Sequence, residues 1–155
     1  MKIPLTQGKY ALVSDEDFGW LTQWKWCFGA KGYAYRGVGT QANPRIYMHK
    51  SILDAPRDKQ VDHINHNTLD NRRSNLRVCT NSQNQFNRRL SINTKTGYKG
   101  VSIANKRNDR WWAYINVQGK RHYLGIFRDK KEAAHAYNQA ALKYHGEFAV
   151  LNRVK

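Results

Sequence analysis

The chain has 155 residues, which is enough for one ordinary domain or two very small ones and too few for a large enzyme. Its 27 Lys and Arg residues against 11 Asp and Glu residues give a formal charge of +16, with a pI near 10.1. Such an excess favours a polyanionic partner, above all nucleic acid.

The first part of the chain alternates short apolar runs with turns. Strands are expected over 10–13, 24–28 and 33–38, with a turn at 29–32. Ser14 and Asp17 have the spacing of a capping box, which predicts a short helix after them. Residues 46–53 (IYMHKSIL) are typical of a strand end that runs into a helical turn. Ordinary burial preferences assign three tryptophans to the core: Trp20, Trp24 and Trp26.

Residues 60–88 have a different pattern. A short apolar run ends in Asp62 and His63, and the Asn-rich loop 65–75 is expected to form its own turns. A second strand is expected over 76–79, and Thr80 with Gln83 forms a capping box that begins a helix. The predicted order is therefore strand, long loop, strand, helix.

This order can bring together the groups that phosphodiester hydrolysis needs. Asp62 and Asn84 offer oxygen ligands, which suit a hard ion such as Mg²⁺ better than Zn²⁺. A neutral His63 can take a proton from water if its other ring nitrogen is fixed, and Asn75 is the candidate for that contact. A lone histidine at a strand end is more often a simple polar residue, so the hypothesis depends on the whole pattern.

The same segments resemble the motif of HNH nucleases, the ββα-metal fold of phage and intron-encoded homing endonucleases, in the runs VDHIN, LDNRRSNLR and TNSQNQFNR. The resemblance implies that His63 is the general base, that Asp62 and Asn84 bind one divalent ion and that Asn75 orients the imidazole. The cut would leave 5′-phosphate and 3′-hydroxyl ends. Mg²⁺ is the expected ion, with Mn²⁺ as the alternative, and no structural zinc is expected.

The last third of the chain predicts a small sheet and one helix. A polar linker at 91–96 precedes strands over 98–103, 111–117 and 121–127. In the middle strand one face carries apolar residues, and the other carries Trp112, Tyr114 and Asn116. Asp129 and Glu132 begin a helix with an Ala-rich face, which Gly146 ends.

This segment resembles the plant ethylene-response-factor (APETALA-type) DNA-binding domain in the runs YKGV, WWAYI, YLGIF, EAAHAYNQAA and HGEFAVLN. The resemblance implies that the sheet contacts DNA, although several family arginines are replaced, by Ser102, Ala104 and Asn116. Lys106 and Arg107 add charge to the same sheet. The residues expected to contact DNA are Arg88, Lys99, Ser102, Arg110, Trp112, Tyr114, Asn116, Arg121 and Tyr123.

The sequence therefore predicts an α+β protein in two parts: an N-terminal ββα-metal HNH nuclease module over 1–90 and, after the linker at 91–96, a three-stranded antiparallel sheet packed on one helix over 97–155. The expected function is a site-specific endonuclease that acts on double-stranded DNA. The alternatives are a DNA-binding regulator with an inactive nuclease module and a basic RNA-binding protein. A homodimer is left open, because sequence does not decide it.

The chain also gives indications about its compartment. Cys27 and Cys79 are too few for a disulfide scaffold or a Cys-rich zinc site, which favours a reducing compartment. No stretch approaches the about 20 apolar residues of a membrane span, and the N-terminus lacks the pattern of a signal peptide. We expect a protein of the bacterial or phage-infected host cytoplasm that is neither secreted nor bound to a membrane.

Overall fold

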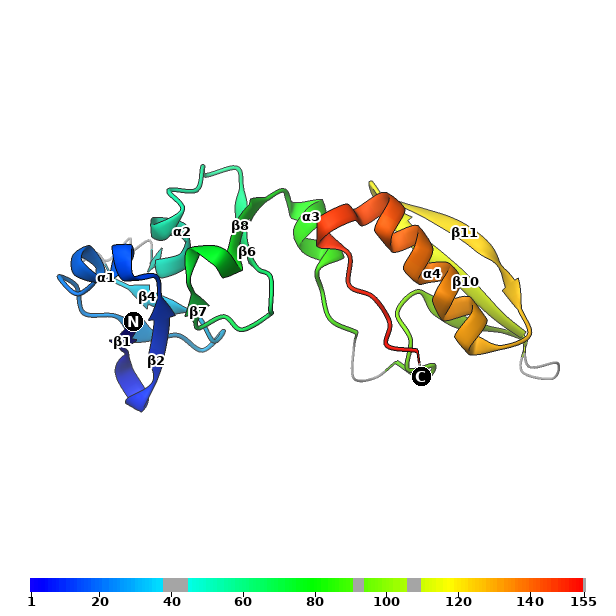
Figure 1. The fold of residues 1–155 in the computed structure, drawn as a ribbon, viewed down its shortest axis with the longest axis horizontal. Coiled ribbons are helices and arrows are strands. Elements are labelled where there is room, and N and C mark those ends of the chain that lie inside the picture. The colour runs from blue at the N-terminus through cyan, green and yellow to red at the C-terminus, as the bar shows by residue number, and fades with distance from the viewer. Residues whose placement is uncertain (38–44, 91–93, 106–109, 155) are drawn as a thin grey trace. The chain divides into compact units, whose positions relative to one another are not determined.

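The structure is a computed structural model that describes residues 1–37, 45–90, 94–105 and 110–154. It forms two compact units, Met1–Asn81 and Ser82–Lys155. The division lies before the linker predicted at 91–96, so residues 82–90, which the sequence assigns to the nuclease module, are compact with the second unit. The mixture of helices and several small sheets confirms the α+β class (Figure 1).

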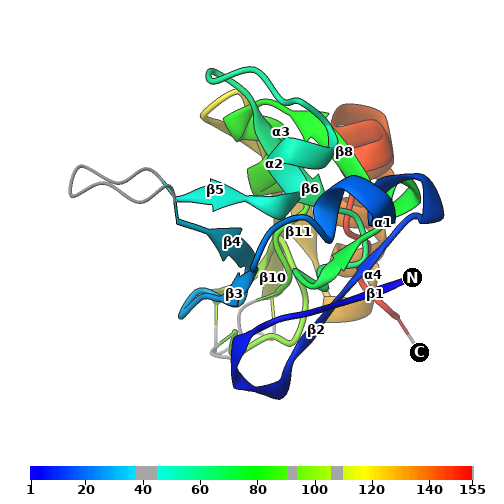
Figure 2. The same ribbon diagram turned by 90° about the vertical axis from the view of Figure 1, so that its left-hand side faces the viewer.

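The described part of the first unit contains three small sheets and two short α-helices, besides 3₁₀ turns. One sheet has the order β1 (Lys2–Pro4), β2 (Tyr10–Val13) and β7 (Asp70–Asn71), and a second has β3 (Cys27–Phe28), β4 (Ala34–Arg36) and β5 (Ile46–Tyr47), which lie side by side in Figure 2. The third is an antiparallel pair of β6 (Gln60–His63) and β8 (Leu76–Cys79). The helices are α1 (Asp15–Leu21) and α2 (Met48–Ile52).

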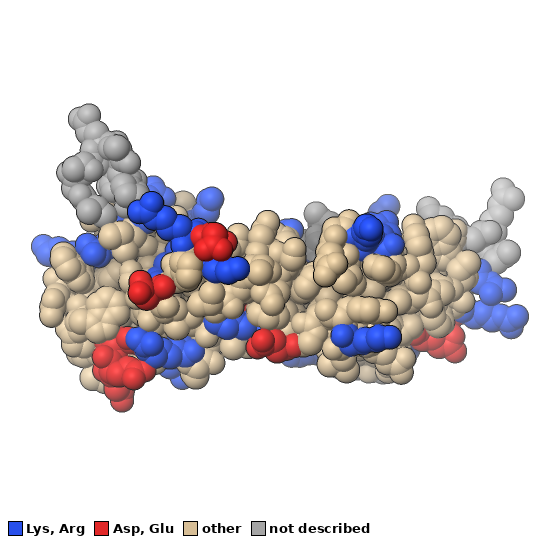
Figure 3. Space-filling view, turned by 90° about the horizontal axis from the view of Figure 1, so that it is seen from above, with Lys and Arg blue, Asp and Glu red and all other residues tan. Residues whose placement is uncertain are grey.

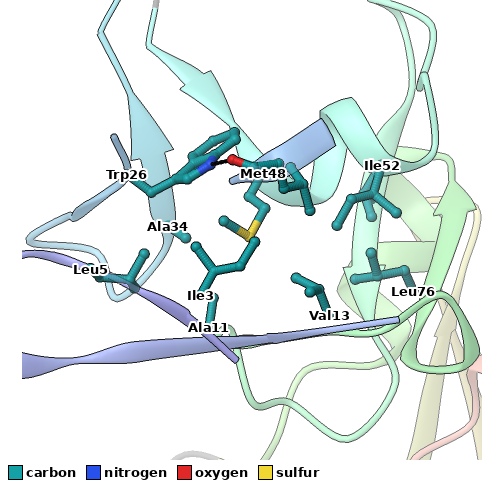
Figure 4. Close-up of a cluster of buried hydrophobic side chains, with 11 residues drawn as sticks. Ile3, Leu5, Ala11, Val13, Trp26, Ala34, Met48, Ile52 and Leu76 are labelled. Carbon is teal, nitrogen blue, oxygen red and sulfur yellow. Dashed lines mark hydrogen bonds between the residues drawn. The ribbon is translucent and has the colours of Figure 1, made fainter. Parts of the chain in front are cut away.

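The core of the first unit is built from residues that lie far apart in the sequence. Ile3 and Val13 from the N-terminal hairpin pack with Met48 and Ile52 of α2 and with Leu76 of β8 (Figure 4). The N-terminal strands therefore complete a core that the short β6–β8 hairpin is too small to form alone.

The prediction that all three tryptophans are buried is wrong for one of them. Trp26 is buried and its Nε1 donates to the carbonyl oxygen of Leu21 over 2.8 Å, while Trp20 is half-buried. Trp24 is 46% exposed, and the guanidinium of Arg36 lies 3.9 Å from the centroid of its ring. The attraction between a cation and the face of an aromatic ring stabilises the ring in its exposed position, so Trp24 does not have to be buried.

The predicted helix after Ser14 is confirmed, but its capping box is not. Ser14 makes no side-chain cap; its Oγ accepts instead from the backbone N–H of Arg73 over 2.9 Å. Asp17 is buried and accepts from Arg73 Nε and Nη2, both over 2.8 Å. The two side chains that we expected to cap α1 thus connect it to the 3₁₀ turn Arg73–Asn75.

The second unit contains the predicted three-stranded antiparallel sheet, which is confirmed in the order β11 (Lys120–Phe127), β10 (Arg110–Val117) and β9 (Val101–Asn105). Helix α4 (Lys130–His145) packs on it, as Figure 1 shows. The predicted cap is present, since Asp129 Oδ1 accepts from the Lys131 N–H over 2.9 Å. Helix α3 (Asn81–Phe86) begins at the boundary of the units.

The small side chains of α4 allow the close packing that the sequence predicts. Its buried residues include Ala133, Ala134 and Ala141, and the ring of Tyr137 lies over the sheet. Gly100, with φ +71, lies where any Cβ would overlap that ring and the backbone of Tyr114. A glycine is therefore required at this position.

Within the described residues, no helix is both long enough and apolar enough to cross a membrane. Lysine and arginine side chains are spread over the face shown in Figure 3 and outnumber the acidic ones.

Candidate functional site

The β6–β8 pair positions the two residues at the centre of the sequence hypothesis. In the antiparallel register, Asp62 lies opposite Arg77 and His63 opposite Leu76. Neighbouring side chains on a strand point to opposite faces, so Asp62 and His63 have different surroundings although both are buried.

His63 is held by Asn71. The distance from His63 Nε2 to Asn71 Oδ1 is 3.2 Å, and Asn71 is fully buried in β7. Strand β7 is itself fixed by parallel pairing with β2, where Val13 lies opposite Asn71. Because an amide oxygen only accepts, Nε2 carries the hydrogen, and the lone pair of the neutral ring is at Nδ1.

Burial also keeps this imidazole neutral. Desolvation lowers the pKa of His63, while the hydrogen bond to Asn71 and the nearby carboxylates of Asp62 and Asp70 partly oppose that shift. The ring is therefore a proton acceptor at neutral pH.

Asn75, which we expected to contact the imidazole, is directed elsewhere. Its Nδ2 donates to the carbonyl oxygen of Asp70 over 2.7 Å, and its Oδ1 accepts from the N–H of Asn65 over 2.9 Å. Asn75 comes just before β8 and faces the inside of the loop, whereas β7 brings Asn71 to the ring. Asn71 therefore makes the contact that we assigned to Asn75, and Asn75 holds the two ends of the loop together.

The loop between β6 and β7 forms its own turns, as predicted. Asn65 Oδ1 accepts from the N–H of Asn67 over 2.8 Å, and Asn67 Oδ1 accepts from the N–H of Leu69 over 3.1 Å. Asp70 accepts from Arg72 Nε and Nη2, both over 2.7 Å, and hydrogen bonding to this guanidinium lowers the pKa of the Asp70 carboxyl. These contacts give the loop a fixed shape beside His63.

A cluster of rings surrounds His63 on another side. The ring of His49, which is buried in α2, has its centroid 5.2 Å from that of His63, with 73° between the planes. The Tyr33 ring lies 5.1 Å from His49 and 5.9 Å from His63. Burial lowers the pKa of His49 to about 3, and His63 and Lys50 contribute to the shift. Sequence reasoning missed His49, whose only signal is a histidine within the apolar run 46–53.

The outer face of the second unit's sheet carries exposed rings, as predicted. Trp112 is 37% exposed and Tyr123 is 61% exposed, and their rings meet edge to face at 5.3 Å. Ile126, which lies opposite Trp112, is 58% exposed. The guanidinium of Arg121 lies 4.3 Å from the Tyr114 centroid. Of the other predicted contacts, Asn116 is exposed and Ser102 and Arg110 are half-buried, while Lys106 and Arg107 lie outside the described residues.

Lys99 differs most from its predicted role as a DNA contact. Its Nζ donates to the carbonyl oxygens of Phe86 and Arg88, over 2.6 and 2.8 Å. Burial lowers the pKa of Lys99 to about 8, and the charge of Arg88 adds to this shift. Lys99 thus satisfies carbonyls at the end of α3.

Arg88, predicted as a DNA contact, lies beyond the end of α3, because the helix ends at Phe86. Arg88 Nη1 donates to Gln85 Oε1 over 3.0 Å. A cleft of about 640 Å³ within the second unit is lined by twelve residues, among them Arg88, Arg89, Lys99, Tyr114 and Asn116. Four of the predicted DNA contacts therefore lie around one basic cleft.

Comparison with known proteins agrees with the nuclease motif. A family model described as HNH endonuclease matches residues 38–86. A protein of Acanthamoeba polyphaga mimivirus named as an uncharacterized HNH endonuclease is 32% identical over 150 residues, which cover 96% of this chain and 77% of the relative. The chain belongs to the HNH endonuclease family. Protein 3.8 of Escherichia phage T7 is 29% identical over 94 residues, which cover 61% of this chain and 76% of the phage protein.

The HNH endonuclease is also similar to plant proteins over a shorter stretch. A putative AP2/ERF and B3 domain-containing protein of Oryza sativa is 46% identical over 56 residues, which cover 36% of this chain and 17% of the rice protein. Because the match covers so little of the plant protein, only a module is comparable.

Asp62, the predicted metal ligand of the HNH endonuclease, is held by a cation. Its Oδ2 accepts from Arg77 Nε and Nη2, over 2.9 and 2.8 Å. Sequence reasoning missed Arg77, although its place opposite Asp62 follows from the antiparallel register. Among the described residues, no three His, Cys, Asp or Glu side chains gather as a metal site. Asn84, the other predicted ligand, lies in the part of α3 that belongs to the second unit.

Proposed function

We propose that this HNH endonuclease hydrolyses phosphodiester bonds of double-stranded DNA with His63 as the general base. The observation that carries the proposal is the hydrogen bond of His63 Nε2 to Asn71 Oδ1, which puts the lone pair of the ring at Nδ1, the atom that would take the proton of the attacking water. The imidazolium that forms keeps this bond, and the carboxylates of Asp62 and Asp70 favour its charge. The products are 5′-phosphate and 3′-hydroxyl ends.

We further propose that Asp62 and Asn84 hold one divalent ion, Mg²⁺ or alternatively Mn²⁺. A carboxylate and an amide oxygen are hard ligands, and such a short protein ligand set suits an ion that keeps waters and binds phosphate oxygens. When bound, the ion would offset negative charge on the phosphate and the leaving oxygen. The pairing of Arg77 with Asp62 Oδ2 holds this carboxylate in one orientation.

The sheet of the second unit is the proposed targeting surface, which would make cleavage site-specific, as in homing endonucleases. Its outer face offers the exposed side chains of Trp112, Tyr123 and Ile126, with Arg121 beside them. In the major groove the thymine methyl is the apolar group that such side chains contact. The similarity to plant AP2/ERF proteins supports this part of the proposal.

The nuclease proposal is tested with supercoiled plasmid in Mg²⁺, Mn²⁺ or EDTA, followed by sequencing of the ends. We expect metal-dependent nicking or linearisation by the wild type and its loss in His63→Ala. His135→Ala is the matched control, because it makes the same replacement on the exposed surface of α4. If the chain binds DNA but does not cut in any metal, it is a DNA-binding regulator, and the nuclease proposal is wrong.

The targeting proposal is tested by selecting duplexes from a random pool in EDTA, so that binding occurs without cleavage. Tyr123→Ser and Ile126→Ser should each weaken binding of the selected duplex by about tenfold. Leu142→Ser, which changes an equally exposed residue on α4, should not. Uracil in place of thymine removes only the methyl group, and a duplex that binds equally well after that exchange would contradict methyl contacts. A preference for RNA would contradict the proposal as a whole.

Linear and nicked products also report on assembly. One active site cuts one strand, so linearisation without accumulation of the nicked circle would favour a homodimer. Gel filtration of the protein with DNA tests the presence of a dimer directly.

A further inference from the structure

His49 is a buried imidazole that the proposed reaction does not use. It lies in the five-residue helix α2, directly after β5, and is 7% exposed. Its ring meets that of His63 at 73° and 5.2 Å, and Tyr33 contacts both rings. Thus α2, together with the segment before β4, brings two rings against the proposed base.

Packing acts on the His63 imidazole in addition to the hydrogen bond with Asn71. Rotation of a histidine about χ2 has broad preferences, so the rings packed around it help to decide its orientation. An aromatic ring packed nearly at right angles against it removes that freedom, because rotation would bring the two rings into overlap. The geometry therefore restrains His63 from two sides: Asn71 on β7 and His49 on α2.

We propose that His49 is a positioning residue, whose ring holds His63 in the orientation that directs Nδ1 at the attacking water. This inference rests on the proposed function of His63. We assign the contribution of His49 to the shape of its ring, which packs against that of His63, and its Nδ1 is buried without a hydrogen-bond partner among the described residues. A phenyl ring should therefore serve equally well, and a methyl group should not.

The test compares His49→Ala with His49→Phe by single-turnover nicking of supercoiled plasmid at saturating enzyme. We expect His49→Ala to lower the rate about 10- to 100-fold, as for other residues that orient a catalytic group, without changing the enzyme concentration that gives half the maximal rate. His49→Phe should restore the rate to within about threefold of the wild type, because the packing contact is kept. Tyr35→Leu is the control, because Tyr35 lies in β4 and its ring packs against that of Tyr47, 6.5 Å away.

A second comparison separates positioning from folding. In a His63→Ala background the residual rate does not use the His63 ring, so His49 has no base to orient. Adding His49→Ala to that background should leave the residual rate unchanged, whereas a merely structural role would lower it again.

Three results would overturn the inference: an equal loss of rate in His49→Phe and His49→Ala when both fold, an unchanged rate in His49→Ala, or a further loss in the double variant. The failure of the proposed function looks different, because wild-type protein would then not cut and His63→Ala would change nothing.

Discussion

The buried His49 makes a specific prediction about stability at low pH. Its pKa in the folded protein is about 3, against 6.5 for the unperturbed side chain. Below pH 6.5 the unfolded chain therefore takes up a proton that the folded protein does not bind, so acid favours unfolding. The stabilisation is fully present above pH 6.5 and is lost as the pH falls from there towards 3.

The magnitude follows from the two pKa values. The free energy of unfolding should fall, through this histidine alone, by about 2 kcal/mol at pH 5 and about 3 kcal/mol at pH 4.5, relative to pH 8. His49 is 7% exposed, so solvent screening reduces this little. These values are a large share of the stability of a small domain.

Pulse proteolysis in urea, with peptides of Met1–Asn81 quantified by mass spectrometry, measures the unfolding of the first unit at each pH. Comparing wild type with His49→Phe gives the contribution of His49 together with its coupling to His63, which is one cause of the His49 shift, while the other titrating groups are common to both proteins. The variant should lose about 2 kcal/mol less between pH 8 and pH 5. If the two proteins lose the same free energy over that range, His49 does not titrate as its burial requires, and the reasoning is refuted.

Three further changes have expected outcomes. Arg73→Met leaves the buried carboxylate of Asp17 without its cationic partner, although Trp20 Nε1 still donates to it, and should cost about 2–4 kcal/mol of unfolding free energy in urea. Adding Asp17→Leu should recover most of this cost, and no recovery would contradict a cost due to the unpaired charge. Asn71→Leu removes the acceptor of His63 Nε2 and should lower the nicking rate about 10- to 100-fold with DNA binding unchanged. An unchanged rate would show that cleavage does not require Asn71 to hold the hydrogen of His63 on Nε2. Gly100→Ala places a Cβ where the Tyr137 ring of α4 lies, at a φ of +71, and should lower the melting temperature of the second unit by about 10 °C or more. A variant that melts at the wild-type temperature would contradict this prediction.

Much of the local structure could be predicted, because it depends on neighbours in the chain. The alternation of Trp111 to Val117 predicted the two faces of β10, and Asp129 predicted the cap of α4. The Asn-rich loop forms its turns between residues two apart, as in Asn65 and Asn67. In each case the partner is within a few residues, so the sequence alone contains the interaction.

The tertiary structure decided which side chains meet across the fold. The sequence predicted Asn75 as the partner of His63, whereas the pairing of β7 with β2 brings Asn71 to the ring. The sequence predicted Lys99 as a DNA contact, but in the structure its ammonium group donates to the carbonyl oxygens of Phe86 and Arg88 at the end of α3. His49 contacts His63 because α2 packs beside β6, and the hydrophobic pattern of the sequence does not predict that contact. Type and spacing of residues thus determined the chemistry available to this protein, whereas the geometry of that chemistry depends on contacts between segments that are distant in the sequence.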